Sequence, residues 1–196
     1  MNNIDIFQAQ LPPYFYYTPG FLSHAEEKFQ QLLHELDRKL YPITMFGKTM
    51  MQPRLVAFYA DVWVDYSYSQ THFYGSGWHP LLQEIKLAII NKYPQTISLN
   101  SVLCNLYRDW NDSMGRHSDN EPQLWDDPII YSVTLGVSRN FQIKSKTTAQ
   151  KYHLILEDNS LLMMWHKSQI DYLHWVPKTQ KIIWPRINLT FRTIVS

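Results

Sequence analysis

Cysteine is nearly absent from this sequence, since Cys104 is the only one in 196 residues. The chain therefore cannot form an internal disulfide, and a zinc site built from several cysteines is excluded. A single thiol is what we expect of a protein in a reducing compartment.

Long apolar runs are missing as well. No stretch of about 18 apolar residues occurs, so we expect no membrane-spanning helix. The first residues, from Met1 to Asp5, contain neither a basic start nor an apolar signal segment. The expectation is an intracellular protein with no membrane partner.

The net charge is only +1, which by itself argues against strong nucleic-acid binding. The charges are nevertheless segregated along the chain. Residues 1–138 contain nine basic and 14 acidic residues, whereas residues 139–196 contain nine and three. The basic part can form a face for phosphates, or the charges can simply be solvated. Six basic residues are candidates for phosphate contacts: Arg54, Arg108, Arg116, Arg139, Lys144 and Lys146.

Apolar periodicity predicts two helices followed by many short strands. The first helix begins with Ser23 as N-cap and Glu26 completing a capping box, and extends to Leu40. The second covers residues 80–92, with Pro80 in its first turn. The strands expected after Ser98 are 102–107, 129–135, 140–144, 152–156, 160–165 and 187–194. This order predicts an α+β protein with a barrel or jelly-roll core. The length fits one domain, residues 1–196.

Three residues are candidates for a metal site. His117 and Asp119 are two positions apart, so on a strand both side chains leave the same face, and His174 is the third candidate. Two imidazoles and one carboxylate leave open positions on an octahedral metal, as in non-heme Fe(II) oxygenases. A catalytic zinc ion is the alternative for the same ligands. Any one of the three, taken alone, is more often structural.

Two arginines near the C-terminus favour the oxygenase interpretation. Arg186 and Arg192 are six positions apart, so on one strand they face the same side. Guanidinium groups bind carboxylates through two parallel hydrogen bonds. Two arginines beside a half-open metal indicate a dicarboxylate co-substrate that chelates the metal.

The order of these motifs resembles the AlkB family of Fe(II)- and 2-oxoglutarate-dependent nucleic-acid dioxygenases, in particular its DNA-repair homologues. The resemblance extends through the whole C-terminal half and, more weakly, to residues 53–61 and 66–69. The most specific segment is Arg186-Ile187-Asn188-Leu189-Thr190-Phe191-Arg192. The other matching segments are Asn105-Leu106-Tyr107, His117-Ser118-Asp119-Asn120-Glu121, Ile130-Tyr131-Ser132-Val133-Thr134-Leu135-Gly136 and His174-Trp175-Val176-Pro177-Lys178.

The resemblance implies a double-stranded β-helix (a cupin-like jelly roll) in residues 98–196. Residues 1–97 would supply flanking helices and the nucleotide-recognition region. His117, Asp119 and His174 would hold Fe(II) and form the catalytic centre. Arg186, helped by Tyr107, would bind the distal carboxylate of 2-oxoglutarate, and Arg192 and Asn105 would contact its chelating end. Asn188 and Thr190 belong to the same cofactor-binding motif.

The activity implied is oxidative demethylation of bases such as 1-methyladenine and 3-methylcytosine in DNA. O2 and 2-oxoglutarate are consumed, succinate and CO2 form, and the methyl group leaves as formaldehyde. We expect a monomer acting on alkylated DNA, in the cytoplasm of a prokaryote or the nucleus of a eukaryote. The alternatives are the same chemistry on RNA or a free nucleoside, and an Fe/2-oxoglutarate hydroxylase of a protein or small molecule. A binding barrel without metal is a further alternative, although all five key residues are present.

The resemblance also suggests residues that hold a flipped base. Tyr68 would stack the base against the His117 ring, and an aromatic wedge at Phe46 would fill the gap left in the stack. A plain hairpin tip is the alternative for the segment around Phe46, and core packing is the alternative for Tyr59 and Tyr68. The full set of expected substrate contacts is Phe46, Gly47, Lys48, Tyr59, Asp61, Tyr66, Ser67, Tyr68, Asn120 and Glu121.

Overall fold

The computed structural model describes residues 11–45, 48–68, 71–94, 98–124, 128–181 and 184–195. Two antiparallel sheets dominate these residues. The six strands of the larger sheet are Phe15–Pro19 (β1), Leu55–Ala60 (β4), Ser101–Tyr107 (β7), Ile130–Gly136 (β9), Ser160–Met164 (β12) and Arg186–Arg192 (β14). The four strands of the smaller sheet are Met114–His117 (β8), Arg139–Ser145 (β10), Lys151–Leu156 (β11) and Tyr172–Val176 (β13).

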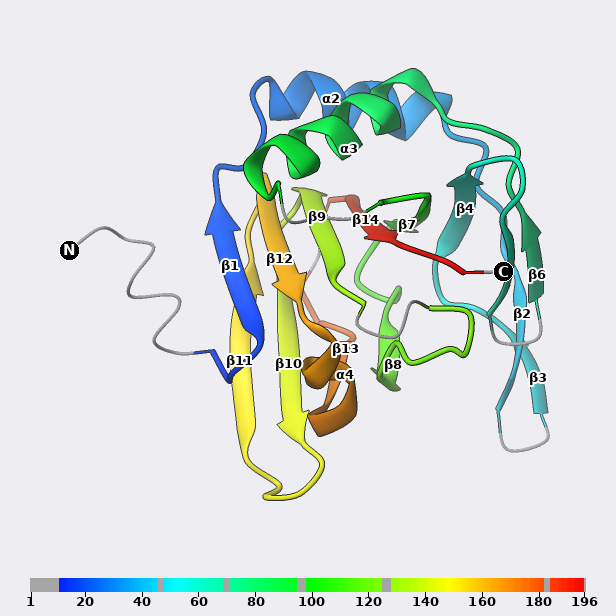
Figure 1. Ribbon diagram of the computed structural model, residues 1–196. Helices are drawn as coiled ribbons and strands as arrows, with labels where there is room; N and C mark the ends of the chain where they lie inside the picture. Colours follow the sequence, from blue (N-terminus) through cyan, green and yellow to red (C-terminus); the bar gives the residue numbers. More distant parts are fainter. Residues whose placement is uncertain are drawn as a thin grey trace.

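The remaining elements flank these sheets (Figure 1). Two hairpins lie on the β4 side: Pro42–Met45 (β2) pairs with Lys48–Met51 (β3), and Asp65–Tyr68 (β5) pairs with Thr71–Tyr74 (β6). The helices are Ala25–Glu35 (α2), Pro80–Lys92 (α3) and His166–Asp171 (α4).

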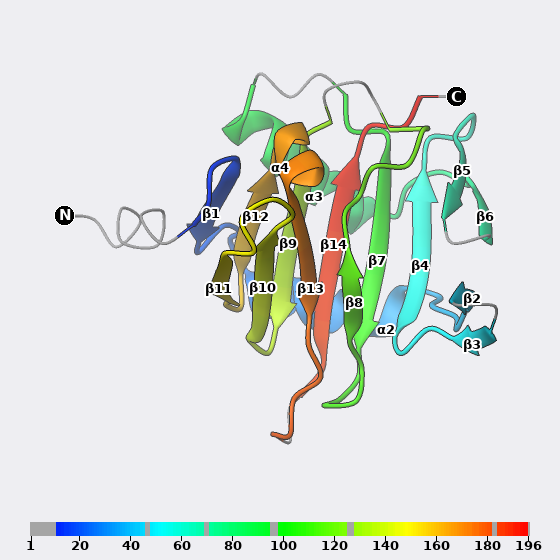
Figure 2. The ribbon, with the colours of Figure 1, turned by 90° about the horizontal axis from the view of Figure 1, so that it is seen from below.

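The two sheets form two layers, and helices α2 and α3 add a third. The larger sheet has the order β1-β12-β9-β14-β7-β4, and the smaller has the order β11-β10-β13-β8. Helices α2 and α3 cover the outer face of the larger sheet, while the smaller sheet lies across its inner face (Figures 1 and 2). The structure thus confirms the expected α+β class with a jelly-roll core.

Buried apolar side chains fill both interfaces. One cluster joins the two long helices to the outer face of the larger sheet, and a second lies between the two sheets. The first contains Phe29, Leu32, Leu82, Ile85, Ile89, Val133, Leu135, Ile187, Leu189 and Phe191; the second contains Phe15, Tyr17, Ile130, Phe141, Ile143, Leu154, Leu162 and Val176. The larger sheet is therefore covered on both faces.

The first helix is shorter than its periodicity predicts. It begins at Ala25, with His24 as an N-cap in the left-handed conformation (φ 51°) and without a side-chain cap. The capping box expected at Ser23 is therefore wrong. The helix ends at Glu35 because the following residues become extended, and the backbone of Lys39 exchanges two hydrogen bonds with Val56 of β4. Pairing with a sheet edge overrides the helical spacing that extends to Leu40.

Other expectations are confirmed. Helix α3 covers residues 80–92, and the His79 side chain accepts a hydrogen bond from the Leu81 backbone N–H at its start. All six expected strands are present, with ends shifted by one or two residues. The pattern did not predict β1, β8 or β13. In β1, Phe15 and Tyr17 are buried and Tyr16 between them is exposed. All three are aromatic, so the alternation does not show in the sequence.

The expected division at residue 97 does not coincide with the sheets. Strands β1 and β4 precede that position, yet both belong to the larger sheet, where β4 pairs with β7 along its whole length. The jelly-roll core thus includes part of the N-terminal half, because β1 and β4 form the two edges of its larger sheet. Among the described helices, none is both long and apolar enough to cross a membrane.

Replacing Gly136 with alanine tests the packing where β9 ends. Gly136 has a φ of +85°, and a Cβ there would lie 2.5 Å from the Pro185 carbonyl oxygen and 2.7 Å from the Phe29 ring. We expect the free energy of unfolding to fall by about 2 kcal/mol or more, because the clash adds to the cost of a left-handed residue. Urea denaturation measures this change.

Gly20→Ala is the matched control. Gly20 has a φ of +62°, but no atom lies within 4 Å of a Cβ placed there. Its loss should be limited to about 1 kcal/mol, the conformational cost alone. Equal losses in the two variants would contradict the packing argument.

Candidate metal centre and active-site cavity

The three candidate metal ligands converge between the two sheets. Strands β8 and β13 pair so that His117 lies directly opposite His174. Asp119 follows two residues after β8, and the ligand atoms of all three side chains lie within 4.8 Å of one another. The Nε2 atoms of His117 and His174 lie 3.6 and 3.8 Å from the Asp119 carboxylate oxygens. The arrangement can hold one metal ion.

The protonation states suit a metal site. Burial lowers the pKa of both histidines, that of His174 to about 3. Burial alone would raise the pKa of Asp119, but Arg192 and the two imidazoles outweigh it and hold the pKa at about 2. The imidazoles are therefore neutral and the carboxylate is ionised near pH 7, as ligation requires.

Hydrogen bonds orient two of the three ligands. His117 Nδ1 lies 2.9 Å from the Gly115 carbonyl oxygen, which selects the tautomer with a free Nε2 lone pair. Arg192 Nη2 donates to Asp119 Oδ1 at 3.1 Å, so one carboxylate oxygen stays free for a metal. Two imidazoles and one carboxylate on one side of a cavity fit Fe(II) with open positions.

Arg192 belongs to a wider polar network. Its Nη1 donates to the Tyr66 hydroxyl at 3.3 Å. Arg54 and Asn105 also line the cavity; Arg54 Nε donates to Asn105 Oδ1 at 2.7 Å, and both side chains are buried. The expected contacts at Asn105 and Arg192 therefore face one cavity, together with Arg54.

Arg186 is the least satisfied buried charge of the site. Its side chain is 1% exposed. Nη2 donates to Thr134 Oγ1 at 2.8 Å, the guanidinium lies 5.1 Å from the Tyr107 ring centroid, and Nε and Nη1 have no hydrogen-bond partner. Burial lowers its pKa to about 10, so the group stays charged. Within the described part of the chain no carboxylate pairs with it. A buried guanidinium in this state is suited to an anionic ligand.

The polar face of β14 connects the two arginines. Asn188 Nδ2 donates to Ser132 Oγ at 2.7 Å, and Thr190 Oγ1 donates to Asn188 Oδ1 at 3.2 Å. These side chains line one cavity. Its other walls are Arg54, Leu103, Asn105, Tyr107, Met114, His117, Asp119, Phe141, Met164, His174, Trp175, Val176 and Arg192. The expected metal and cofactor residues thus line one cavity, except Arg186, which contacts the cavity-lining residue Tyr107.

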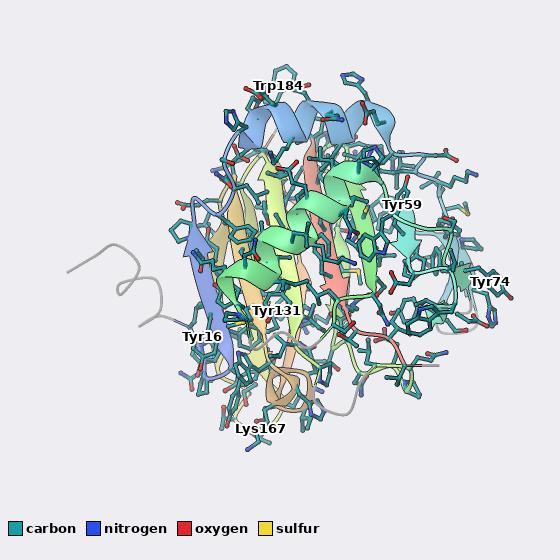
Figure 3. All side chains as sticks on the ribbon, turned by 45° about the horizontal axis from the view of Figure 1, so that its top comes forward. Tyr16, Tyr59, Tyr74, Tyr131, Lys167 and Trp184 are labelled. Atoms are coloured by element: carbon teal, nitrogen blue, oxygen red, sulfur yellow. The ribbon has the colours of Figure 1, made fainter. Side chains whose placement is uncertain are left out.

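Several expected substrate residues lie elsewhere. Tyr59 shares the side of β4 that packs against the helix-covered core, and its ring lies 6.3 Å from that of His79 (Figure 3). Asp61 accepts a hydrogen bond from Trp78 Nε1 at 2.6 Å, and Ser67 Oγ lies 3.0 Å from His72 Nδ1 on an exposed hairpin. These three side chains do not line the cavity. The two-residue period of the strand turns Tyr59 away from it.

Tyr66 and Glu121 are the expected substrate residues that reach the site. Tyr66 is fully buried and contacts Arg192. Burial raises the pKa of Glu121, against the pull of Arg192. Asn120 is exposed beside it. Phe46 and Gly47 lie outside the described residues. Lys48 and Tyr68 lie on β3 and β5, and their roles stay predictions.

Two of the expected phosphate contacts are buried instead. Arg54 is 3% exposed and faces the cavity. Arg139 is equally buried, and its Nη2 donates to the carbonyl oxygens of Asp112 and Pro177. Arg108 remains partly exposed, with its guanidinium on the Asp112 carboxylate at 2.8 and 2.9 Å. Arginine in a sequence does not indicate on which side of a strand it lies.

Sequence reasoning missed Ser132 and Thr134 as site residues. They lie on the β9 face that pairs with Thr190 and Asn188 of β14, and they bind Asn188 and Arg186. The signal was present, because two polar residues alternate within an otherwise apolar, buried strand. Such positions must find polar partners across the sheet.

The comparisons with known proteins agree with this geometry. The model of the 2OG-Fe(II) oxygenase superfamily matches residues 14–192. The chain is 38% identical over 188 residues to the alpha-ketoglutarate-dependent dioxygenase alkB homolog 3 of Bos taurus, with 90% of this chain and 64% of that relative covered. It is 34% identical over 184 residues to the DNA oxidative demethylase ALKBH2 of Homo sapiens, with 88% and 70% covered.

One solved structure supports the fold. A structure described as that of OsALKBH1 superposes with a TM-score of 0.63 at 17% identity, covering 93% of this chain and 99% of the other. The chain spans 64% of the length of alkB homolog 3 from Bos taurus, so that protein's substrates do not transfer automatically. The match over residues 14–192 and the 34% identity to a relative covered to 70% establish that this chain belongs to the 2OG-Fe(II) oxygenase superfamily and, within it, to the AlkB family.

Proposed function

We propose that this protein is an Fe(II)- and 2-oxoglutarate-dependent dioxygenase that removes methyl groups from N-alkylated bases in DNA, such as 1-methyladenine and 3-methylcytosine. The observation that carries the proposal is the His117, Asp119 and His174 cluster in a cavity that adjoins the unpaired guanidinium of Arg186. The printed names of two relatives, a DNA oxidative demethylase and an alpha-ketoglutarate-dependent dioxygenase, support the reaction class.

The residues present fit the cofactors of the family. His117, Asp119 and His174 would hold Fe(II). When bound, iron and 2-oxoglutarate supply the oxidation: O2 is consumed, 2-oxoglutarate gives succinate and CO2, and the N-methyl carbon gains a hydroxyl group. The hydroxymethyl group then leaves the base as formaldehyde, and the ring nitrogen recovers its electron pair. The protein positions these partners.

The protein's own residues divide this work along β14. At its start, Arg186 would bind the distal carboxylate of 2-oxoglutarate. Tyr107, whose ring lies beside the Arg186 guanidinium, would bind the same carboxylate through its hydroxyl group. At its end, Arg192 fixes one oxygen of Asp119 by a bond of 3.1 Å. Asn105, Asn188 and Thr190 would present amide and hydroxyl groups to the co-substrate between them.

The substrate side of the cavity is less complete. A base in a duplex must leave the stack to reach the metal. Tyr66 and Glu121, which reach the site, and the neighbouring Asn120 would face the polar edge of such a base. Tyr68 as the stacking platform, and the segment Phe46-Gly47-Lys48 as a wedge, stay part of the proposal. We propose a monomer that acts on DNA inside the cell, in the cytoplasm or the nucleus.

An oligodeoxynucleotide with one 1-methyladenine tests the reaction. We expect loss of the methyl group and release of succinate when Fe(II), ascorbate and 2-oxoglutarate are present, both followed by mass spectrometry. Asp119→Ala should abolish both, because the metal loses its carboxylate ligand. Asp158→Ala is the control: this exposed carboxylate accepts a hydrogen bond from the Gly136 N–H and does not line the cavity.

The outcomes separate the parts of the proposal. Succinate release without methyl loss would retain the iron chemistry and exclude this substrate, and an RNA strand with the same lesion would be tested next. Full activity in Asp119→Ala would remove the ligand assignment.

The hydroxyl of Tyr107 provides a test of co-substrate binding. Tyr107→Phe keeps the ring over the Arg186 guanidinium but removes the phenolic oxygen. We expect the KM for 2-oxoglutarate to rise about tenfold with little change in kcat, because one hydrogen bond to a charged group is lost. Initial rates at varied 2-oxoglutarate measure both constants.

Tyr93→Phe is the matched control. Tyr93 is half-buried, its hydroxyl lies 3.1 Å from Thr18 Oγ1, and it does not line the cavity. Its variant should lose stability and keep the native KM. If both variants show the native KM, Tyr107 does not serve the co-substrate.

A further inference from the structure

The β8–β13 strand pair positions His117 and His174, two of the three candidate metal ligands. The third, Asp119, must be positioned by other contacts. His117 and His174 are cross-strand neighbours in the β8–β13 pair. Asp119 lies beyond the end of β8, where the ladder no longer supplies backbone partners. It is nevertheless 2% exposed. Its backbone N–H therefore needs a partner from within the protein.

We propose that Gln169 of helix α4 is the positioning residue that fixes the metal ligand Asp119. The inference rests on the proposed function in one respect, the use of Asp119 as a metal ligand. Gln169 Oε1 accepts the hydrogen bond from the Asp119 backbone N–H at 2.9 Å. This contact joins segments that lie 50 positions apart in the sequence.

Gln169 is itself held in one orientation. The side chain is fully buried, and its Nε2 donates to Ser168 Oγ at 2.8 Å, while Ser168 is also fully buried. The amide oxygen is therefore directed at Asp119, because the opposite assignment would place two N–H donors face to face. Because both the oxygen and the nitrogen of this buried amide are hydrogen-bonded, the side chain has few alternative rotamers.

Lys146 adds a second link between the same two segments. Its Nζ donates to the Gln169 carbonyl oxygen at 2.7 Å and to Ser118 Oγ at 3.2 Å. Its backbone N–H also donates to the Asp171 carbonyl oxygen at 2.8 Å. The segment of Ser118 and Asp119 is thus tied to α4 at two consecutive residues.

Helix α4 also directly precedes the strand that carries a second metal ligand. Helix α4 leads directly into β13, which carries His174 (Figure 2). A shift of α4 would therefore move Asp119 relative to His174. The ladder sets the spacing of the two imidazoles, and Gln169 sets the place of the carboxylate beside them.

A Co(II) titration of the metal-free protein, followed by the visible absorption of the bound ion, tests this role without using turnover. Gln169→Asn shortens the side chain by one methylene, so its amide no longer reaches the Asp119 N–H. We expect Co(II) to bind 10- to 100-fold more weakly, roughly the effect of removing a group that orients a metal ligand. Gln169→Glu keeps an acceptor at the same reach and should bind Co(II) within about threefold of the native protein.

Gln52→Asn is the matched control, since Gln52 is 2% exposed and no hydrogen bond connects it with the described metal ligands. It should lose stability in urea as Gln169→Asn does, yet keep the native Co(II) affinity. Native affinity in Gln169→Asn, or equal losses in the Asn and Glu variants, would overturn the inference. If the native protein binds no Co(II), the metal assignment itself fails, and the inference fails with it.

Discussion

The register of β14 is the constraint on which the rest of the cavity depends. This strand pairs with β7 on one side and β9 on the other, and all seven of its residues are buried. Ile187, Leu189 and Phe191 pack into the helix-covered core, whereas Arg186, Asn188, Thr190 and Arg192 lie on the opposite face. A slip of one residue would exchange the two sets. It would bury two guanidinium groups under the helices and turn three apolar side chains into the cavity.

The same constraint explains the different surroundings of the two arginines. Arg192 meets the Asp119 carboxylate, so this buried pair is charge-balanced before any ligand enters. Among the described residues, the polar partners of Arg186 are neutral groups, namely the Thr134 hydroxyl and the Tyr107 side chain. Leaving a buried charge unpaired destabilises a fold unless a ligand completes it. One arginine therefore belongs to the metal centre, and the other provides the charge that an anionic co-substrate can neutralise.

The metal-ligand and co-substrate residues could be predicted from the sequence, but the strands that surround the site could not. Side chains spaced by even numbers on a strand share a face, so the grouping of Arg186 with Arg192 on β14 could be predicted. His117 and Asp119 also converge, but not for the expected reason, because β8 ends at His117 and Asp119 lies beyond it. The cluster itself could not be placed from spacing, since it depends on β8 and β13, which periodicity did not reveal. These strands are short, and β13 is buried at nearly every position, so alternation is weak.

Long-range partners were also beyond reach of the sequence. Gln169, Ser132 and Arg54 contact the site from α4, β9 and the residue before β4. Each carries an ordinary polar side chain whose role depends on which segment lies opposite. The helix expected to reach Leu40 failed for the same reason, since the backbone near Lys39 finds a sheet partner in Val56. Tertiary pairing decides such cases, and local propensity does not.

Substrate choice must then lie in the parts of the cavity that the β14 face does not supply. His174 and Arg186 lie on strands that are buried at nearly every position, so the placement of these two side chains tolerates little change. Tyr59 lies on β4, but its side chain packs against the helix-covered core and does not line the cavity. Tyr66 and Glu121 come from a hairpin strand and a loop beside the metal ligands. Loops and hairpins can vary without disturbing the ladder. Proteins of this fold can therefore differ in substrate through the residues around Tyr66 and Glu121. The buried polar face of β14 can stay the same, so the chemistry is retained.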